Sequence, residues 1–290
     1  MHILEELWYG AAVAYAKYYT FVKHHFGIER QKLFFFVRNI RKARVIKVGG
    51  LLFQMNPEVS TSFARMLGGA FNEEGTHELL YRVIKGVESI DLFVDVGSNI
   101  GEFVVDIGSL DGVGYTIGFE PNPACVNSCL KSIELNRLKN VRVVQKILSD
   151  SRKEVHFNLH GEHAHIHSIF DQPTSESDVV DSSTLDDELQ NVGAKVILLI
   201  DVEGAETLVM KGGKKFIDRN FPFIIFEYNH ISRRHFTLEE VRKLLPQGYQ
   251  IFRLRSDGYL DDQLENSSNC VAVHKNSSFR NIESLLFKRG

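Results

Sequence analysis

A turn between Asp95 and Gly101, with the sequence Asp-Val-Gly-Ser-Asn-Ile-Gly, carries the most chemically informative pattern in the chain. It follows a short apolar run and precedes a helical pattern. Gly97 permits a tight turn, and the missing Cβ of Gly101 lets the helix start pack close to a ligand. The first N–H groups of such a helix have no partner within it. The pattern predicts a nucleoside-cofactor site contacted by Asp95, Gly97, Asn99 and Gly101.

Polar residues further along the chain extend this predicted site. Glu120 ends the next predicted strand, where a carboxylate can accept both hydrogen bonds of a ribose 2′,3′-diol. Asn122 either contacts the nucleoside or caps the following helix. Ser149 and Asp150 follow the third strand and either contact the adenine base of the nucleoside or only form a turn. The glycine spacing differs from the GxGxxG fingerprint of dinucleotide-binding proteins.

Candidate groups for proton transfer follow two later strands. Asp201 leaves the fourth predicted strand, and Glu227 and His230 leave the fifth. Ligands of open α/β sheets bind outside the carboxyl ends of the strands, so we expect these side chains beside the glycine turn. Glu203 and Glu206 either join them or begin a helix, where acids favour the dipole. Such acids can also hold a divalent cation, but we assign no metal ligand.

The strands and helices that must position these residues alternate from Asp91 onward. We expect strands at 91–96, 114–120, 141–148, 196–202 and 222–228, and helices at 99–108, 122–136, 184–190, 205–217 and 237–245. Strands separated by helices predict an α/β fold with a mostly parallel, doubly wound sheet. The last two strands, 249–255 and 269–275, lack a helix between them and predict an antiparallel edge.

A histidine-rich segment interrupts this alternation. Residues 153–160 and 163–170 predict a β-hairpin, and 171–181 a loop. His163, His165 and His167 alternate and therefore share one face of a strand, and His160 lies nearby. Three imidazoles could bind zinc, but no second ligand set at characteristic spacing is present in the sequence. We expect an exposed hairpin face near the substrate.

The first 85 residues are expected to form an accessory region in front of a main domain at 86–290. Residues 3–26 predict a helix, and 43–56 a hairpin turning at Gly49-Gly50. Seven basic residues and no acid lie between Arg30 and Lys47. One interpretation is peripheral contact with an anionic membrane surface. The preferred interpretation is packing on the sheet domain or on a partner subunit, and the oligomeric state stays open.

The bulk properties limit the function classes. The 290 residues carry a net charge of -3, which gives no general attraction to nucleic acid. No run of about 18 apolar residues is present, and the acidic start MHILEELWYG is unlike a signal peptide. We therefore expect a cytoplasmic protein, with membrane association as the alternative location.

Five motifs taken together resemble the FkbM-type methyltransferase family: FVDVGSNIGEF, GFEPNP, SSTLDD, IDVEGAETLVMKGG and FIIFEYN. The resemblance covers about Leu92–Asn229. It implies a class I methyltransferase (Rossmann-like) fold, with S-adenosylmethionine as the donor held at the glycine turn. Family members are mostly O-methyltransferases of sugars, glycans or polyketide-type products. Leu199 stands where many members carry a lysine, which puts that lysine's role in doubt.

The resemblance gives the acidic strand ends a role. Methyl transfer to a hydroxyl of a small-molecule or glycan acceptor requires a base for its proton. Asp201, Glu227 and His230 are the candidates, with Asp201 preferred. A nicotinamide-dependent oxidoreductase is the second hypothesis, disfavoured by the glycine spacing and the IDVEG segment. A non-catalytic binding protein on the same fold is the third.

Overall fold

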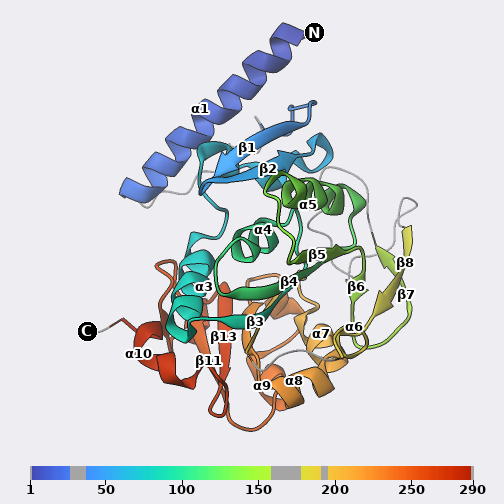
Figure 1. Ribbon diagram of the computed structural model, residues 1–290, viewed down its shortest axis with the longest axis vertical. Coiled ribbons are helices and arrows are strands. Elements are labelled where there is room, and N and C mark those ends of the chain that lie inside the picture. The colour runs from blue at the N-terminus through green and yellow to red at the C-terminus, as the bar shows by residue number, and fades with distance from the viewer. Residues whose placement is uncertain (1, 27–36, 158–177, 191–194, 289–290) are drawn as a thin grey trace.

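The structure is a computed structural model that describes residues 2–26, 37–157, 178–190 and 195–288. The short apolar runs of the sequence form its central sheet. In this part of the chain, eight strands lie in the order β12-β11-β13-β10-β9-β3-β4-β5 (Figure 1). The strands are β3 (Ile90–Val96), β4 (Val113–Phe119), β5 (Val141–Val144), β9 (Val196–Ile200), β10 (Phe223–Glu227), β11 (Tyr249–Leu254), β12 (Leu260–Asp261) and β13 (Asn269–His274). Every residue of β9 is buried, which is typical of a strand covered on both faces.

The strand directions confirm the predicted mostly parallel sheet with an antiparallel edge. Strands β5, β4, β3, β9 and β10 run parallel to one another. Strand β13 is antiparallel to both β10 and β11, and β12 adds an antiparallel pair at the edge. The chain moves outward from β3 to β4 and β5, then returns to the other side of β3 for β9. This reversal creates the crevice in which open α/β sheets bind ligands.

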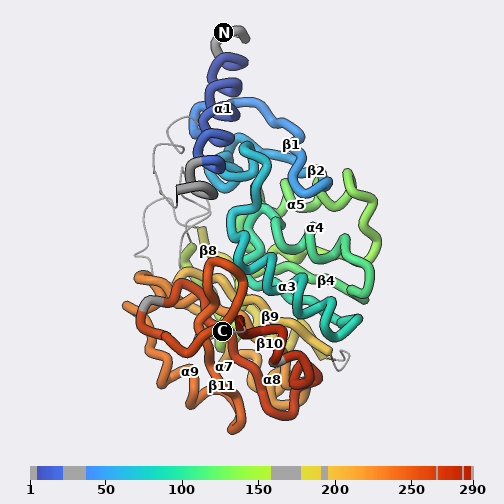
Figure 2. The backbone as a smooth tube through the Cα atoms, turned by 90° about the vertical axis from the view of Figure 1, so that its left-hand side faces the viewer, coloured from blue at the N-terminus to red at the C-terminus, as the bar shows by residue number. Residues whose placement is uncertain are grey.

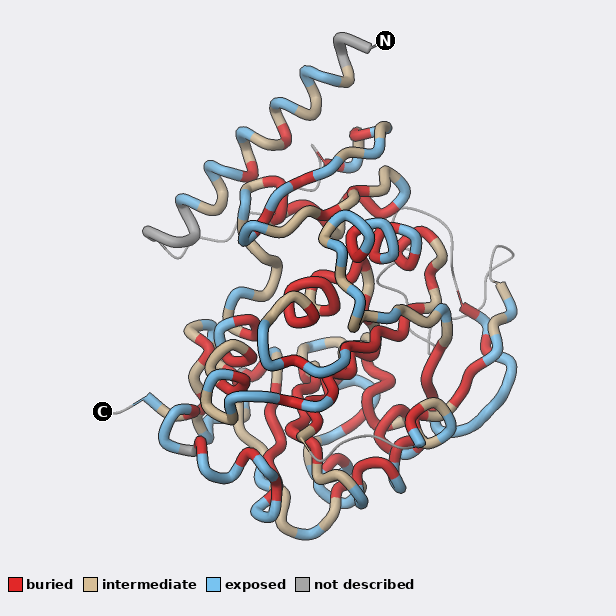
Figure 3. Tube along the Cα trace, in the orientation of Figure 1, coloured by how far each residue is buried: buried red, intermediate tan, exposed pale blue. Residues whose placement is uncertain are grey.

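Helices cover both faces of the sheet (Figures 1 and 2). One face carries α6 (Leu185–Glu188), α7 (Glu206–Gly212), α8 (Lys214–Asn220) and α9 (Leu238–Leu244). The other carries α3 (Glu74–Val87), α4 (Glu102–Gly108), α5 (Pro123–Leu135) and α10 (Glu283–Leu286). Alternate residues of β3 serve the two cores: Val94 packs on the first face and Phe93 on the second. Figure 3 shows the buried residues concentrated along the sheet and the inner helix faces.

The N-terminal region adds an outer layer above α4 and α5. It holds α1 (His2–Phe26) and the predicted hairpin, β1 (Arg44–Val48) and β2 (Leu51–Met55). The 3₁₀ helices η1 (Pro57–Phe63) and η2 (Met66–Gly68) follow. The side chain of Asn136 binds both backbone groups of Leu52, at 3.0 and 2.7 Å, and thereby ties β2 to the end of α5. None of the helices in the described parts of the chain is both long and apolar enough to cross a membrane.

Three local predictions were wrong. The expected strand 141–148 divides into β5 and β6 (Ile147–Leu148), and β6 joins a separate three-stranded sheet. In that sheet β7 (Glu154–Phe157) pairs antiparallel with β8 (Asp178–Ser183), a strand that overlaps the expected loop. The expected helix 205–217 is two helices, α7 and α8, which meet at Gly213. The predicted partner strand 163–170 and the histidines at 160–167 lie outside the described residues.

Candidate active site

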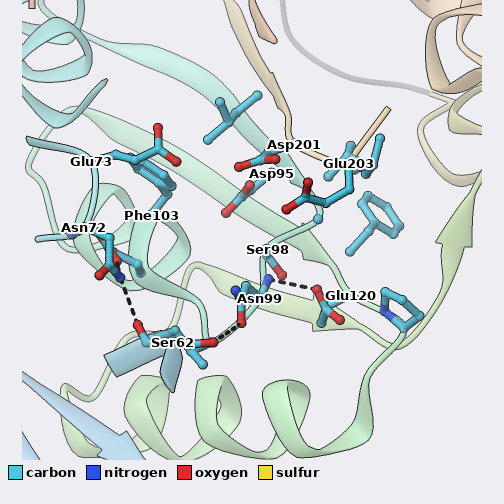
Figure 4. Close-up of a pocket in the computed structure, with 18 of the residues that line it drawn as sticks. Ser62, Asn72, Glu73, Asp95, Ser98, Asn99, Phe103, Glu120, Asp201 and Glu203 are labelled. Carbon is cyan, nitrogen blue, oxygen red and sulfur yellow. Dashed lines mark hydrogen bonds between the residues drawn. The ribbon is translucent and has the colours of Figure 1, made fainter. Parts of the chain in front are cut away.

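A cavity of about 360 Å³ lies at the carboxyl ends of β3, β4 and β9, where the sheet order reverses (Figure 4). Its first wall, called the strand-end wall, consists of residues 95–100 and 119–121 together with Leu199, Asp201, Val202, Glu203 and Ala205. Its second wall, called the N-terminal wall, consists of Thr61, Ser62, Ala64, Arg65, Asn72 and Glu73 together with Tyr19 of α1. The accessory region predicted from the sequence therefore contributes directly to the cavity.

The glycine turn is fixed to the loop after β9 by backbone contacts. Gly97 has φ +87°, and a Cβ placed on it would lie 1.8 Å from the carbonyl oxygen of Asp201. The N–H of Asp201 donates to the carbonyl of Val96 at 2.9 Å. Gly97 is therefore required both by its backbone conformation and by the close approach of Asp201. This contact holds Asp201 beside the turn.

Gly101 serves helix packing instead of lining the cavity. It has φ +81°, and a Cβ there would lie 2.1 Å from the Sγ of Cys129 on α5. Asp95, Gly97 and Asn99 do line the cavity. The missing side chain of Gly101 thus lets α4 and α5 approach each other, which is a different use from the ligand contact that the spacing predicted.

Glu120 lies buried at the end of β4 and lines the cavity. Its Oε2 accepts the N–H of Asn99 at 2.9 Å, and its Oε1 accepts the N–H of Asn122 at 2.8 Å. Burial raises the pKa of Glu120 to about 7, against the opposing effect of these two hydrogen bonds. Two bonds leave acceptor capacity on a carboxylate, so Glu120 can still receive hydroxyl hydrogens from a ligand.

The other residues predicted near the nucleoside have structural partners. Asn122 caps α5, since its Oδ1 accepts the N–H of Ala124 at 2.8 Å. Ser149 is fully buried, and its carbonyl oxygen lies 2.0 Å from where a Cβ of Gly212 would stand. Asp150 pairs with Lys153 at 2.7 Å. None of these three predicted contacts is among the residues that line the cavity.

Apolar residues instead form that end of the cavity. Ile147 and Leu148 of β6 line it, together with Phe119, Pro121 and Phe157. Because 141–148 is broken into two strands, Ile147 and Leu148 face the cavity two positions before the predicted pair. An aromatic base could pack among these side chains.

Carboxylates gather at the opposite end of the cavity. Figure 4 shows Glu73, Asp95, Asp201 and Glu203 directed into the same space. Burial, followed by repulsion from Glu73 and the other neighbouring acids, raises the pKa of Asp95 well above its usual range. Burial and repulsion, first from Glu227, do the same to Asp201. These shifts mark a region that would stabilise a bound cation.

The base candidates from strand five differ in position. Glu227 offers a carboxylate oxygen within 4.8 Å of those of Asp201 and Glu203, close enough for the three to share a cation. Burial, followed by repulsion from Glu203, raises the pKa of Glu227 to about 9. His230 is exposed, and neither His230 nor Glu227 is among the residues that line the cavity.

The sequence interpretation missed the N-terminal wall. Ser62 Oγ donates to the Oδ1 of Asn99 at 3.2 Å, and Asn72 Nδ2 donates to the carbonyl of Ser62 at 3.0 Å. Glu73 Oε2 accepts from Thr76 Oγ1 at 2.9 Å, just before α3. An acid just before a predicted helix was the available signal for Glu73. Ser62 and Asn72 carried none, because their partners lie far away in the sequence.

The sheet order and the cavity together define a class I methyltransferase fold. Strands β5-β4-β3-β9-β10 follow the doubly wound order 3-2-1-4-5, and the reversed β13 is inserted before β11. The model of the methyltransferase FkbM domain matches residues 95–258, which is more than half of the chain. The chain belongs to the FkbM methyltransferase family.

Several solved methyltransferase structures are similar to the chain. The FkbM methyltransferase of Methylobacillus flagellatus KT is 18% identical, with 64% of this chain and 44% of that chain covered, at a TM-score of 0.45. TYW2 of M. jannaschii in complex with AdoMet is 16% identical, with 80% of this chain and 84% of that chain covered, at a TM-score of 0.40. The human methyltransferase 10 domain containing protein is 12% identical, with 92% of this chain and 96% of that chain covered, at a TM-score of 0.43. The chain spans less than half the length of the first of these, and no curated protein sequence matches it.

Proposed function

We propose that the chain is an S-adenosylmethionine-dependent O-methyltransferase that acts on a hydroxyl of a sugar, a glycan or another small acceptor. The observation that carries this proposal is the polarity of the cavity: an apolar end, Glu120 beside it, and clustered carboxylates at the far end. A nucleoside with a cationic tail matches these three parts of the cavity in the same order, with its base at the apolar end, its ribose at Glu120 and its cation at the carboxylates.

The wall chemistry fits this donor. The apolar residues Ile147, Leu148 and Phe157 suit the adenine base. The Glu120 carboxylate retains acceptor capacity for the ribose hydroxyls. S-adenosylmethionine supplies a methyl group on a positively charged sulfur, and its amino-acid part carries a second cation. Among the residues that the structure describes, six acids and two basic residues line the cavity, and this excess of acids favours such a ligand. The acids are Glu73, Asp95, Glu102, Glu120, Asp201 and Glu203, and the basic residues are Arg65 and Lys146.

Asp201 is the proposed base for the acceptor hydroxyl. It lines the cavity and is held beside the glycine turn by its own backbone. A carboxylate with a raised pKa is a stronger base than an ordinary aspartate. Glu227 is the second candidate because its carboxylate lies within 4.8 Å of the one on Asp201. Positioning of the hydroxyl by the surrounding walls would supply much of the remaining rate gain.

The donor is tested by titration calorimetry of the whole chain with S-adenosylmethionine and, separately, with NADH. We expect binding of the former only. The Glu120→Ala variant should bind S-adenosylmethionine about 10- to 100-fold more weakly, because a buried carboxylate that accepts hydrogen bonds is lost. Glu134→Ala, on the exposed side of α5, is the matched control and should bind normally. NADH binding alone, or equal affinity of the two variants, would contradict the assignment.

The acceptor class is tested by a screen with labelled S-adenosylmethionine. We expect label transfer to hydroxyl-bearing sugars or related small molecules. Transfer to amines alone would replace the O-methyltransferase proposal with an N-methyltransferase. Donor binding without transfer to any acceptor would favour the non-catalytic hypothesis.

A further inference from the structure

A buried histidine lies behind the N-terminal wall, outside the cavity lining. His77 of α3 is 2% exposed, and its ring stacks between Phe71 and Phe103 at centroid distances of 4.1 and 4.3 Å. Its Nδ1 lies 2.6 Å from the Oδ2 of Asp106, and its Nε2 lies 3.0 Å from the Oε1 of Glu102. Both ring nitrogens thus face carboxylates, and with both carboxylates ionised this arrangement requires two N–H donors and hence an imidazolium.

The surroundings of His77 support the charged form. Burial alone would lower the pKa of His77, but the hydrogen bonds to Asp106 and Glu102 outweigh it and raise the pKa to about 9. Two aromatic faces also favour a cation between them. Further groups with an electrostatic influence are Tyr81, whose hydroxyl donates to Asp106 at 2.6 Å, and the acids Glu73 and Asp95.

Glu102 connects this imidazolium to the cavity. Its Oε1 also accepts the N–H of Asn72 at 2.7 Å, and its Oε2 accepts from the Asn72 side chain. The Asn72 side chain also donates to the carbonyl of Ser62, and the Ser62 hydroxyl donates to the side chain of Asn99 in the glycine turn. The backbone N–H of Asn99 then donates to Glu120 (Figure 4). An unbroken series of hydrogen bonds therefore runs from His77, through the N-terminal wall, to the proposed ribose-binding carboxylate.

We propose that His77 is a positioning residue: a buried imidazolium that fixes the N-terminal wall against the glycine turn, so that donor affinity depends on the charge of His77. This inference rests on the proposed function, because it concerns affinity for S-adenosylmethionine. His77 and the wall residues Ser62 and Asn72 lie before the segment that the family model matches, while their partners Glu102 and Asp106 lie within it. His77 would act through Glu102 and Asn72, without touching the donor.

The test compares His77→Gln with His274→Gln. His274 is also 2% exposed and stacked on an aromatic ring, Phe221, at 4.1 Å, but its Nε2 faces the carbonyl of Gln247, and it does not line the cavity. Affinity for S-adenosylmethionine is measured by calorimetry at pH 7, and thermal unfolding is recorded for each protein. We expect H77Q to bind about tenfold more weakly and H274Q to bind like the wild type, since only H77Q leaves buried carboxylates without their cation.

A pH series separates positioning from a merely structural role. Affinity for S-adenosylhomocysteine is measured at pH 7 and pH 10. The ligand's own amino group also titrates between these pH values, so the informative quantity is the difference between wild type and H77Q. The wild type should lose about fivefold more affinity than H77Q across this range, because only the wild type loses the imidazolium charge.

The outcomes distinguish this inference from the proposed function. Failure of the wild type to bind either ligand would overturn the proposed function itself. Wild-type binding with unchanged affinity in H77Q, and parallel pH curves, would overturn the role of His77 alone. If H77Q does not fold, Asn72→Ser provides the same test, since it removes the side-chain bonds to Glu102 and Ser62 and keeps the imidazolium. Normal donor affinity in N72S would then contradict the inference.

Discussion

The two walls of the cavity are built in different ways. In the strand-end wall, parallel strand pairing sets the backbone, and Gly97 and Asp201 meet through backbone atoms. In the N-terminal wall, the side chains of Ser62 and Asn72 reach across to the turn and to α4. The strand-end wall therefore belongs to the sheet itself, while the N-terminal wall depends on a buried charge network behind it.

This difference coincides with one bound of the family match. The strand-end wall lies within the segment that the family model matches, and the N-terminal wall lies before it. We infer that the first wall supplies the donor site and the proton acceptor, and that the second adjusts its affinity. Substitutions in the first wall should therefore have larger effects than substitutions in the second.

The largest effect is expected at Asp201. Asp201→Asn should lower turnover by about 10²- to 10⁴-fold, the range for loss of a general base, with a smaller loss of donor affinity because one of several carboxylates facing the donor is removed. Methyl transfer to the acceptor found in the screen measures turnover, and calorimetry measures affinity. Asp218→Asn, at an exposed ion pair with Lys214, is the control. Full turnover in D201N would contradict the role of Asp201 as the general base and make Glu227 the next candidate.

The next effect concerns the backbone contact at Gly97. Gly97→Ala should lower the free energy of unfolding by more than about 3 kcal/mol, because a left-handed conformation is combined with a clash against Asp201. Gly50→Ala has a similar φ, +91°, and open space around the added Cβ. It should cost only about 1–2 kcal/mol. Chemical denaturation measures both, and equal losses would show that the close approach to Asp201 has no energetic role.

The donor-free protein should lose stability as the pH rises. Burial raises the pKa of Glu120 to about 7 and, with its acidic neighbours, that of Glu227 to about 9. Burial alone would lower the pKa of His77, but its two carboxylate partners outweigh burial and raise this pKa to about 9. For each group, the folded protein still binds a proton at pH values between its unfolded and folded pKa, where the unfolded chain has released it. The free energy of unfolding therefore falls as the pH rises between these two pKa values. We expect a decrease of at least about 3 kcal/mol between pH 5 and pH 9, which the His77 shift alone contributes at about 1.4 kcal/mol per pKa unit.

The pH effect can be divided between the walls. Urea denaturation at each pH measures the total, and His77→Gln should flatten the curve between pH 6.5 and 9 only. A stability that rises from pH 5 to pH 9 would contradict the assigned shifts.

The smallest effect is expected at Ser62 in the N-terminal wall. Ser62→Ala removes one neutral hydrogen bond to Asn99 and should weaken donor binding about two- to fivefold. Ser278→Ala, exposed near the C-terminus, is the control, and calorimetry is the measurement. A loss as large as that of Glu120→Ala would show that the N-terminal wall contributes as much as the strand ends.

The sequence predicted the strand-end wall well for a physical reason. Parallel strands place their carboxyl ends at one edge, so recognising the strands was enough to bring Asp95, Glu120 and Asp201 together. The same logic failed at Ser149 and Asp150, because the break between β5 and β6 shifts the cavity contacts to Ile147 and Leu148.

The N-terminal wall could not be derived in that way. The hydrogen bonds that join Ser62, Asn72, Asn99 and Glu102 span 10 to 37 positions and follow no helical or strand period. His77 lies on the apolar face of α3, where the pattern indicates only core packing. Its partners Glu102 and Asp106 sit on another helix, which only the folded chain brings into contact with it.

The most direct test of the account is an experimental structure of the chain with S-adenosylhomocysteine bound. We predict that the ribose diol contacts Glu120, that the base lies among Ile147, Leu148 and Phe157, and that the thioether faces the carboxylates of Asp95 and Asp201. A nucleoside bound elsewhere, or in the reverse direction along the cavity, would contradict the assignment.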